Sequence, residues 1–309
     1  MESHDKNMDR RESLLERAAG AYDMSEALTG RSAPRLDISA IPPAAPVYEA
    51  PAHQAAGVDA PCVARPWSGP VQQIDRIALA EAGYIVPDGP VSAIGEEFRI
   101  VKRQLLAGID AGDAATRRIL ICSAQPGEGK TFCTVNLALS LAAETDLDVL
   151  LVDSDFANPR APAMLGLEAS GPGFMDVLAD PALPVEDLVI RTDLPSLAVL
   201  PAGRATNSDT EYLASARTPK LLERLAAGHP NRIILFDSPP LLVASPASVL
   251  AAHVGQALMI VRADMTSEGA LRDAAGMLKD CPKVQLLLNA VKFSASGRKF
   301  GSYYGKAAA

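Results

Sequence analysis

The residues best suited to chemistry lie in a loop that runs from Ala124 to Thr131. An apolar segment, 119–123, precedes this loop, and the segment 132–143 that follows has the composition of a helix. This order is typical of a phosphate-binding site, because the loop N–H groups and the helix N-terminus attract an anion. In such a site Lys130 contacts the β- and γ-phosphates, and the Thr131 hydroxyl binds Mg²⁺.

Two glycines give this loop the backbone freedom that the function needs. Gly127 and Gly129 allow successive N–H groups to turn toward one polyphosphate. Ala124 replaces the first glycine of the pattern G-x-x-x-x-G-K-[ST], which is a small change in size. An ordinary glycine-rich turn is the alternative, but it would not need a lysine and a hydroxyl in register. The residues that we expect around the phosphates are Gln125, Pro126, Gly127, Glu128, Gly129, Lys130, Thr131 and Phe132.

Carboxylates follow two further apolar segments. Asp153 and Asp155 come directly after 149–152, and Asp237 comes after 232–236. Because ligands collect at the carboxyl ends of the strands in doubly wound sheets, we expect these side chains near the phosphates. Asp237 fits a carboxylate that orders Mg²⁺ directly or through water. For the first pair, a turn that ends a strand is the alternative.

The chain divides by composition into four parts. Residues 1–19 predict a short helix, 20–90 a Pro- and Ala-rich linker that is mostly disordered, 91–291 the phosphate-binding domain, and 292–309 a flexible tail. Apolar strands alternate with helices throughout the domain. This pattern predicts an α/β fold with a doubly wound, mostly parallel sheet of the P-loop NTPase type.

Two other features suggest function only weakly when taken alone. The helix predicted from Ser92 carries Glu96, Arg99 and Lys102 on its charged side, which would ordinarily be a solvated face. The tail carries Tyr303 and Tyr304, which could be phosphoacceptors on a flexible tether or simply part of a frayed chain end.

Composition excludes several classes of protein. The 309 residues are 48% hydrophobic and carry a net charge of −8, which fits a globular domain and argues against a general nucleic-acid binder. The four cysteines lack metal-ligand spacing, so we expect reduced thiols. With no apolar stretch of eighteen residues and no secretory signal, we expect a cytoplasmic protein.

The motifs together resemble a known family. SAQPGEGKT, VLLVDSD and IILFDSPP, with a tyrosine-bearing tail, resemble the bacterial tyrosine autokinases (BY-kinases) of exopolysaccharide and capsule loci, within the Mrp/MinD-like P-loop ATPases. EEFRIVKRQLL and PAMLGLE are most similar to the cytoplasmic, exosortase-associated branch. The resemblance implies a kinase that transfers the γ-phosphate of Mg·ATP to C-terminal tyrosines of a neighbouring subunit.

The resemblance also implies residue roles. Lys130, Asp153 and Asp155 would be catalytic, and Thr131, Asp153 and Asp237 would hold the metal. Asn289 would hold the adenine. The helix residues Glu96, Arg99 and Lys102 would pack subunits into a ring, and Tyr303 and Tyr304 would accept phosphate.

Partners and rivals follow from the same resemblance. An inner-membrane polysaccharide co-polymerase of the Wzz type would recruit and activate the chain, and a cognate tyrosine phosphatase would fit. One departure weakens the kinase interpretation: Ala157 stands where relatives have arginine after Asp-x-Asp, unless Arg160 substitutes. Two alternative functions are a ParA/MinD-like ATPase switch and an ATP-binding adaptor of the co-polymerase. A ParA/MinD-like loop would carry lysine where this chain has Gln125.

Overall fold

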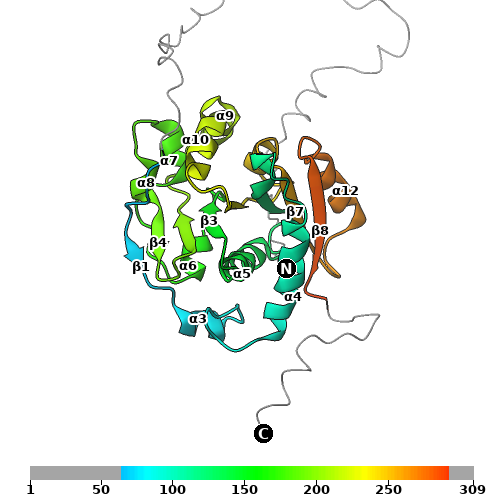
Figure 1. Ribbon diagram of the computed structural model, residues 1–309. Helices are drawn as coiled ribbons and strands as arrows, with labels where there is room; N and C mark the ends of the chain where they lie inside the picture. Colours follow the sequence, from blue (N-terminus) through cyan, green and yellow to red (C-terminus); the bar gives the residue numbers. More distant parts are fainter. Residues whose placement is uncertain (1–63, 292–309) are drawn as a thin grey trace, which may run out of the picture. The chain divides into compact units, whose positions relative to one another are not determined.

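The computed structural model describes residues 64–291. Eight strands form one sheet in the order β1-β4-β5-β3-β6-β2-β7-β8 (Figure 1). The strands are β1 (Val71–Gln72), β2 (Arg118–Ser123), β3 (Asp148–Asp153), β4 (Ile190–Thr192), β5 (Leu197–Leu200), β6 (Arg232–Asp237), β7 (Gln256–Arg262) and β8 (Lys283–Asn289). Every pair is parallel except β4 with β5, so the predicted mostly parallel sheet is confirmed.

Helices cover both faces of the sheet, as its apolar strands require. One face packs against α3 (Arg76–Glu81), α4 (Ala93–Leu106), α5 (Lys130–Ala142) and α6 (Ala161–Met164). The other packs against α7 (Phe174–Ala179), α8 (Val185–Leu188), α9 (Asp209–Ala214), α10 (Arg217–Ala226), α11 (Pro246–Ala251) and α12 (Glu268–Gly276). A short 3₁₀ helix, η2 (Ala114–Arg117), leads into β2. Each face therefore has its own hydrophobic core.

The register of the central strands sets the position of the site. In β3 and β6 the last residues, Asp153 and Asp237, lie directly opposite each other. Strand β2 lies on the other side of β6 and ends at Ser123, immediately before the glycine-containing loop. The parallel arrangement thus brings the loop and both carboxylates to one edge of the sheet, as the sequence predicted.

Residues 64–90 differ from the linker that we predicted there. They include β1, which pairs with β4, and α3, whose N-terminus is capped by the Asp75 carboxylate. Leu79 is fully buried, and the Arg232 guanidinium lies 4.4 Å from the centre of the Trp67 ring. Apolar anchors and a helix cap therefore hold this segment on the domain, although its sequence shows no sustained hydrophobic period. The remainder of the predicted linker, the N-terminal helix and the tail lie outside the described residues.

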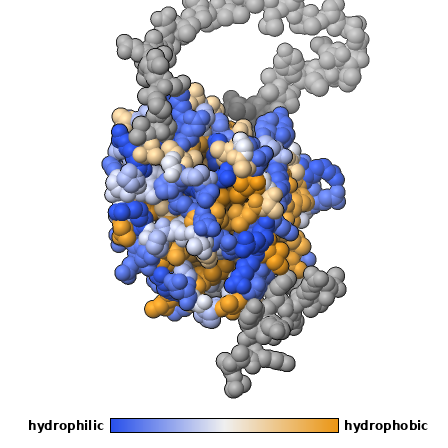
Figure 2. Space-filling view, in the orientation of Figure 1, coloured by the Kyte–Doolittle hydropathy of each residue, from blue (hydrophilic) through white to orange (hydrophobic). Residues whose placement is uncertain are grey.

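The edge strand β8 is less covered than the others. Leu286 and Leu288 are 59% and 57% exposed, and Val284 is 40% exposed on the same side of the strand. Figure 2 shows hydrophobic residues at the surface in this region, among hydrophilic ones.

Within residues 64–291, no helix is long and apolar enough to cross a membrane.

Candidate nucleotide-binding site

The glycine-containing loop adopts the conformation that its sequence predicts. Gly127 and Gly129 have φ values of 77° and 97°, a region that side chains disfavour. A Cβ atom on Gly129 would also lie 2.2 Å from the Asn289 Nδ2 atom, so only glycine fits there. Gly129 is the N-cap of α5, and the helix N-terminus therefore faces the loop. These features give the loop the backbone geometry that an anion site requires.

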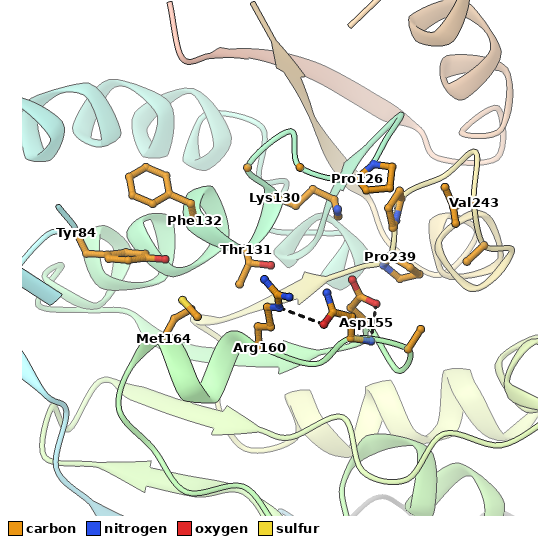
Figure 3. Close-up of a pocket in the computed structure, with 16 residues that line it drawn as sticks. Tyr84, Pro126, Lys130, Thr131, Phe132, Asp155, Arg160, Met164, Pro239 and Val243 are labelled. Atoms are coloured by element: carbon orange, nitrogen blue, oxygen red, sulfur yellow. Dashed lines mark hydrogen bonds between the residues drawn. The ribbon is translucent and has the colours of Figure 1, made fainter. Parts of the chain in front are cut away.

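The loop opens into a cavity of about 440 Å³. Figure 3 shows Lys130, Thr131, Asp155 and Arg160 in the middle of this cavity. Lys130 is only 7% exposed, so its ammonium group is largely withdrawn from bulk water. A charge in such a place acts more strongly on a bound phosphate than it would at the surface.

Hydrophobic residues form the two ends of the cavity. At one end the Tyr84 and Phe132 rings lie 4.8 Å apart between centroids, and at the other end lie Pro239 and Val243 (Figure 3). The Ile85 N–H donates to the Asn136 side chain at 2.8 Å, which fixes the segment that carries Tyr84 on α5. From the sequence, Tyr84 could be expected only as a single anchor of the linker on the folded domain, and its place at this cavity was not predicted.

Three side chains hold the loop from the side opposite the cavity: one at the end of β7, one in the β7–α12 turn and one at the end of β8. Arg262 Nη1 donates to the Gly127 carbonyl at 2.6 Å, and Asn289 Nδ2 donates to the Glu128 carbonyl at 2.9 Å. The Thr266 hydroxyl donates to Glu128 Oε1, and Glu128 Oε2 accepts the Gln125 N–H at 2.8 Å. We call Arg262, Thr266 and Asn289 the loop clamp.

The clamp changes the roles predicted for two residues. The Glu128 side chain is fully buried and supports the loop backbone, so it does not line the cavity. Asn289, which the family resemblance placed at the adenine, here uses its amide on the loop and does not line the cavity either. Both residues therefore position the phosphate site from outside it.

Asp237 has the geometry of a metal-site carboxylate. It is 1% exposed; its Oδ1 atom accepts the Thr134 hydroxyl at 2.9 Å, and its Oδ2 atom has no hydrogen-bond partner. Burial raises the pKa of Asp237 to about 6, although the Thr131 and Thr134 hydroxyls and Lys130 favour the ionised form. An orphaned carboxylate oxygen next to Thr131 fits a divalent cation, because Mg²⁺ takes one or two protein oxygens and completes its shell with phosphate and water. Accordingly, no group of three or more acidic, His or Cys side chains forms a closed metal site within 64–291.

Asp153 lies beside Asp237, but its carboxylate accepts hydrogen bonds from backbone N–H groups. Its Oδ2 atom accepts the N–H groups of Arg160 and Ala161, both at 2.9 Å, and its Oδ1 atom accepts that of Asp155 at 3.2 Å. Burial and the Asp237 charge raise the pKa of Asp153 to about 7, against these backbone donors. Asp153 does not line the cavity, so in this conformation it shapes the loop 154–161 that follows β3.

Asp155 and Arg160 reach the cavity from that loop. Asp155 Oδ1 accepts the Asn158 N–H at 3.2 Å, and Arg160 Nε donates to Asn158 Oδ1 at 3.1 Å (Figure 3). Burial raises the pKa of Asp155, while Lys130 and Arg160 oppose this change. The terminal nitrogens of Arg160 have no hydrogen-bond partner among the described residues, so they are available to an anion in the cavity.

The structure thus brings together most of the predicted phosphate and metal residues, and it separates others. Those that line the cavity are Pro126, Gly127, Gly129, Lys130, Thr131, Phe132 and Asp155. Asp237 lies beneath them, and Gln125 contributes through its backbone. The predicted phosphoacceptors Tyr303 and Tyr304 lie outside the described residues.

The charged face of α4 differs from its predicted use at one residue. Lys102 is 5% exposed; its Nζ atom lies 2.6 Å from the Glu144 carboxylate and donates to the Ser140 carbonyl at 2.7 Å. It therefore ties α4 to α5 and is not available to a second subunit in this conformation. Arg99 remains half exposed and pairs with Glu96 at 2.6 Å. An interface role stays a proposal for Glu96 and Arg99 only.

The fold and the site define a P-loop NTPase: a mostly parallel sheet with a phosphate loop between β2 and α5 and carboxylates at the ends of the adjacent strands. In agreement, residues 114–201 match the sequence profile of the ParA family, described as NUBPL iron-transfer P-loop NTPase.

Similarity to particular proteins narrows this class. The chain is 28% identical over 224 residues to EpsB of Ralstonia nicotianae, and 27% identical over 234 residues to the tyrosine-protein kinase YwqD of Bacillus subtilis. These alignments cover 72% and 75% of this chain, 28% of EpsB and 94% of YwqD. This chain also resembles the crystal structure of the VpsO kinase domain, with a TM-score of 0.53 and 29% sequence identity. The match covers 62% of this chain and 93% of that domain. The chain is therefore similar in sequence and in fold to bacterial tyrosine-protein kinases, and it spans just over a quarter of the length of EpsB.

Proposed function

We propose that this protein is a tyrosine autokinase that transfers the γ-phosphate of ATP to Tyr303 and Tyr304 of a neighbouring subunit. The observation that carries the proposal is the cavity itself, in which Lys130, Thr131, Asp155 and Arg160 converge beside the buried carboxylate of Asp237. The similarity to bacterial tyrosine-protein kinases supports it independently.

The residues of the cavity would act mainly by position and charge, as phosphoryl transfer requires. The loop N–H groups and the α5 N-terminus would hold the phosphates, and Lys130 would neutralise the γ-phosphate. Thr131 and Asp237 would hold Mg²⁺, which would supply positive charge to neutralise the phosphates.

Asp155 is the carboxylate that can take part in proton transfer. It lines the cavity, and its raised pKa makes it a better proton acceptor than an exposed aspartate. Asp153 would act through it, since its carboxylate accepts the Asp155 N–H and fixes the loop. The tyrosine oxygen would attack the γ-phosphorus in line and pass its proton to Asp155, while the bond to the bridging β-phosphate oxygen breaks and ADP leaves.

Arg160 would supply the cation that Ala157 cannot. Its backbone N–H is held by Asp153 and its Nε atom by Asn158, which leaves the terminal nitrogens to meet the transferred phosphate. Arginine is suited to this task because its planar fork can bind two phosphate oxygens at once.

The biological setting is part of the same proposal. We infer a role in the regulation of exopolysaccharide polymerisation or export, in the exosortase-associated branch of the family. The chain would form a ring-like homo-oligomer in the cytoplasm and be recruited to the inner membrane by a Wzz-type co-polymerase. A tyrosine phosphatase would remove the phosphate from its tyrosines. The motif resemblance supports these statements.

Mass spectrometry of the C-terminal peptide after incubation with Mg·ATP tests the proposal. The samples are the protein alone and with the cytoplasmic segment of a candidate co-polymerase. We expect phosphate on Tyr303 or Tyr304 that is absent from the Lys130→Ala and the Tyr303→Phe/Tyr304→Phe variants. ATP binding without tyrosine phosphate in either sample would instead favour a regulatory ATPase or an adaptor.

A further inference from the structure

A second cavity, of about 320 Å³, adjoins the nucleotide cavity. The two share the residues Ala157, Pro239, Val243 and Ala244, which belong to the loops that follow β3 and β6. A side chain bound in the second cavity would therefore lie next to the loop that carries Asp155. We call it the acceptor pocket, and its size is within the range of about 300 to 1,000 Å³ that is usual for ligand sites.

The walls of the acceptor pocket combine apolar surface with neutral hydrogen-bonding groups. Phe156, Pro239 and Pro246 supply the apolar part. Thr210 Oγ1 and Ser245 Oγ lie 2.8 Å apart, and this contact joins α9 to the segment before α11. An aromatic ring that carries a hydroxyl matches such walls, because its face is apolar and its edge needs a polar partner.

The charge of the pocket excludes a second phosphate site. Among residues 64–291, no Lys, Arg or His side chain lines it, and Asp209 is the one charged residue that does. Asp209 Oδ1 accepts the N–H and the hydroxyl of Thr206 at 2.7 and 2.8 Å, whereas Oδ2 has no recorded hydrogen bond within 64–291. A cationic group on the ligand would be attracted by this carboxylate.

The sequence of the chain contains a segment with the matching chemistry. Residues 292–309 include Lys292, Arg298, Lys299 and Lys306, no acidic residue, and the adjacent Tyr303 and Tyr304. We propose that the acceptor pocket binds this segment, with one tyrosine ring inside it and the flanking basic residues near Asp209. The proposal rests on the proposed function, because it names the site from which the tyrosine approaches the γ-phosphate.

Binding of a synthetic peptide tests the pocket without requiring catalysis. The peptide has the sequence of residues 296–309 and is titrated into the full chain loaded with Mg²⁺ and a non-hydrolysable ATP analogue. Asp209→Asn should weaken peptide binding roughly three- to fivefold, as expected for one partly exposed charge. Glu211→Gln is the matched control, since both residues lie in the first turn of α9 but only Asp209 lines the pocket. Glu211→Gln should leave the peptide affinity unchanged.

A bulky side chain should close the pocket directly. Thr210→Trp is expected to weaken peptide binding about tenfold or more while the affinity for the ATP analogue stays at the wild-type value, because Thr210 does not line the nucleotide cavity. Asn207→Trp, on the exposed loop before α9, gives a second test if Thr210→Trp destabilises the fold.

The outcomes separate the two proposals. Peptide binding that the pocket variants weaken, without phosphate transfer by the wild type, would support the pocket and count against the kinase. Phosphate transfer to the peptide with unchanged affinity in Asp209→Asn and Thr210→Trp would overturn the pocket alone. Failure of the wild type to bind the peptide, or equal effects of Asp209→Asn and Glu211→Gln, would also overturn it.

Discussion

Replacing Asp237 by asparagine should stabilise the protein in the absence of Mg²⁺ and nucleotide. The Asp237 carboxylate is 1% exposed, one of its oxygens has no hydrogen-bond partner, and it faces Asp153 across β3 and β6. A buried charge in this position costs stability when no cation is bound beside it. Asparagine removes the charge and keeps an oxygen that can accept the Thr134 hydroxyl.

The magnitude follows from the pKa. Burial raises the pKa of Asp237 from 3.8 to about 6, and one unit corresponds to about 1.4 kcal/mol. Well below pH 3.8 both the folded and the unfolded chain hold the proton, so the carboxyl has little effect on the free energy of unfolding. Between pH 3.8 and about 6 the unfolded form is ionised while the folded form resists ionisation, so the free energy of unfolding falls with rising pH, and it levels off above pH 6. At pH 8 the cost is at most about 3 kcal/mol, and at pH 5 it is about half of that.

Urea unfolding at pH 5 and pH 8, without Mg²⁺ or nucleotide, measures this effect. We expect Asp237→Asn to raise the free energy of unfolding by about 1 to 3 kcal/mol at pH 8 and by about half as much at pH 5. Asp146→Asn, which removes an exposed carboxylate, serves as the control for the loss of one negative charge. Mg·ATP should stabilise the wild type and fail to stabilise Asp237→Asn. A loss of stability in Asp237→Asn at pH 8, or an equal gain at both pH values, would refute the reasoning.

Four further predictions concern the loop clamp, the phosphates and the N-terminal segment. Thr266→Val should weaken ATP binding roughly three- to tenfold by calorimetry, whereas Thr266→Ser, which keeps the hydroxyl, should restore it; equal affinities would contradict the clamp. Arg160→Ala should lower kcat for tyrosine phosphorylation, and adding Ala157→Arg should recover part of the lost kcat. An unchanged kcat in Arg160→Ala would show that Arg160 does not contact the phosphate. Lys130→Ala should abolish Mg·ATP binding and leave circular dichroism and solubility unchanged, because the loop adds little to the core; loss of folded protein would show a structural role. Leu79→Ala should lower the free energy of unfolding by about 2 to 5 kcal/mol in urea, and a negligible loss would mean that residues 64–90 do not belong to the core.

The central fold and the phosphate loop could be predicted because their determinants are local in sequence. The strands that end at Ser123, Asp153 and Asp237 have continuous apolar segments because they are buried on both faces, and the fold places their last residues at one edge of the sheet. The glycines of the loop have positive φ values, as the pattern implies. Periodicity and motif spacing carry such information directly.

Other features depend on contacts between distant segments, which spacing does not reveal. Lys102 looks like part of a solvated helix face until α5 brings Glu144 within 2.6 Å of its ammonium group. Asn289 matched an adenine position, yet the close approach of β8 to the loop directs its amide to the Glu128 carbonyl. The segment 64–90 shows no sustained hydrophobic period, although Asp75 and Leu79 supply a cap and an anchor.

A phosphate balance tests the central claim most directly. The purified full chain is incubated with Mg·ATP, and phosphotyrosine and free inorganic phosphate are quantified in the same sample, with Lys130→Ala as the blank. An autokinase predicts that early ATP consumption equals the phosphate found on Tyr303 and Tyr304, and that both vanish in Lys130→Ala. Consumption of ATP that appears entirely as inorganic phosphate, with both tyrosines unmodified, would contradict the kinase and leave a regulatory ATPase.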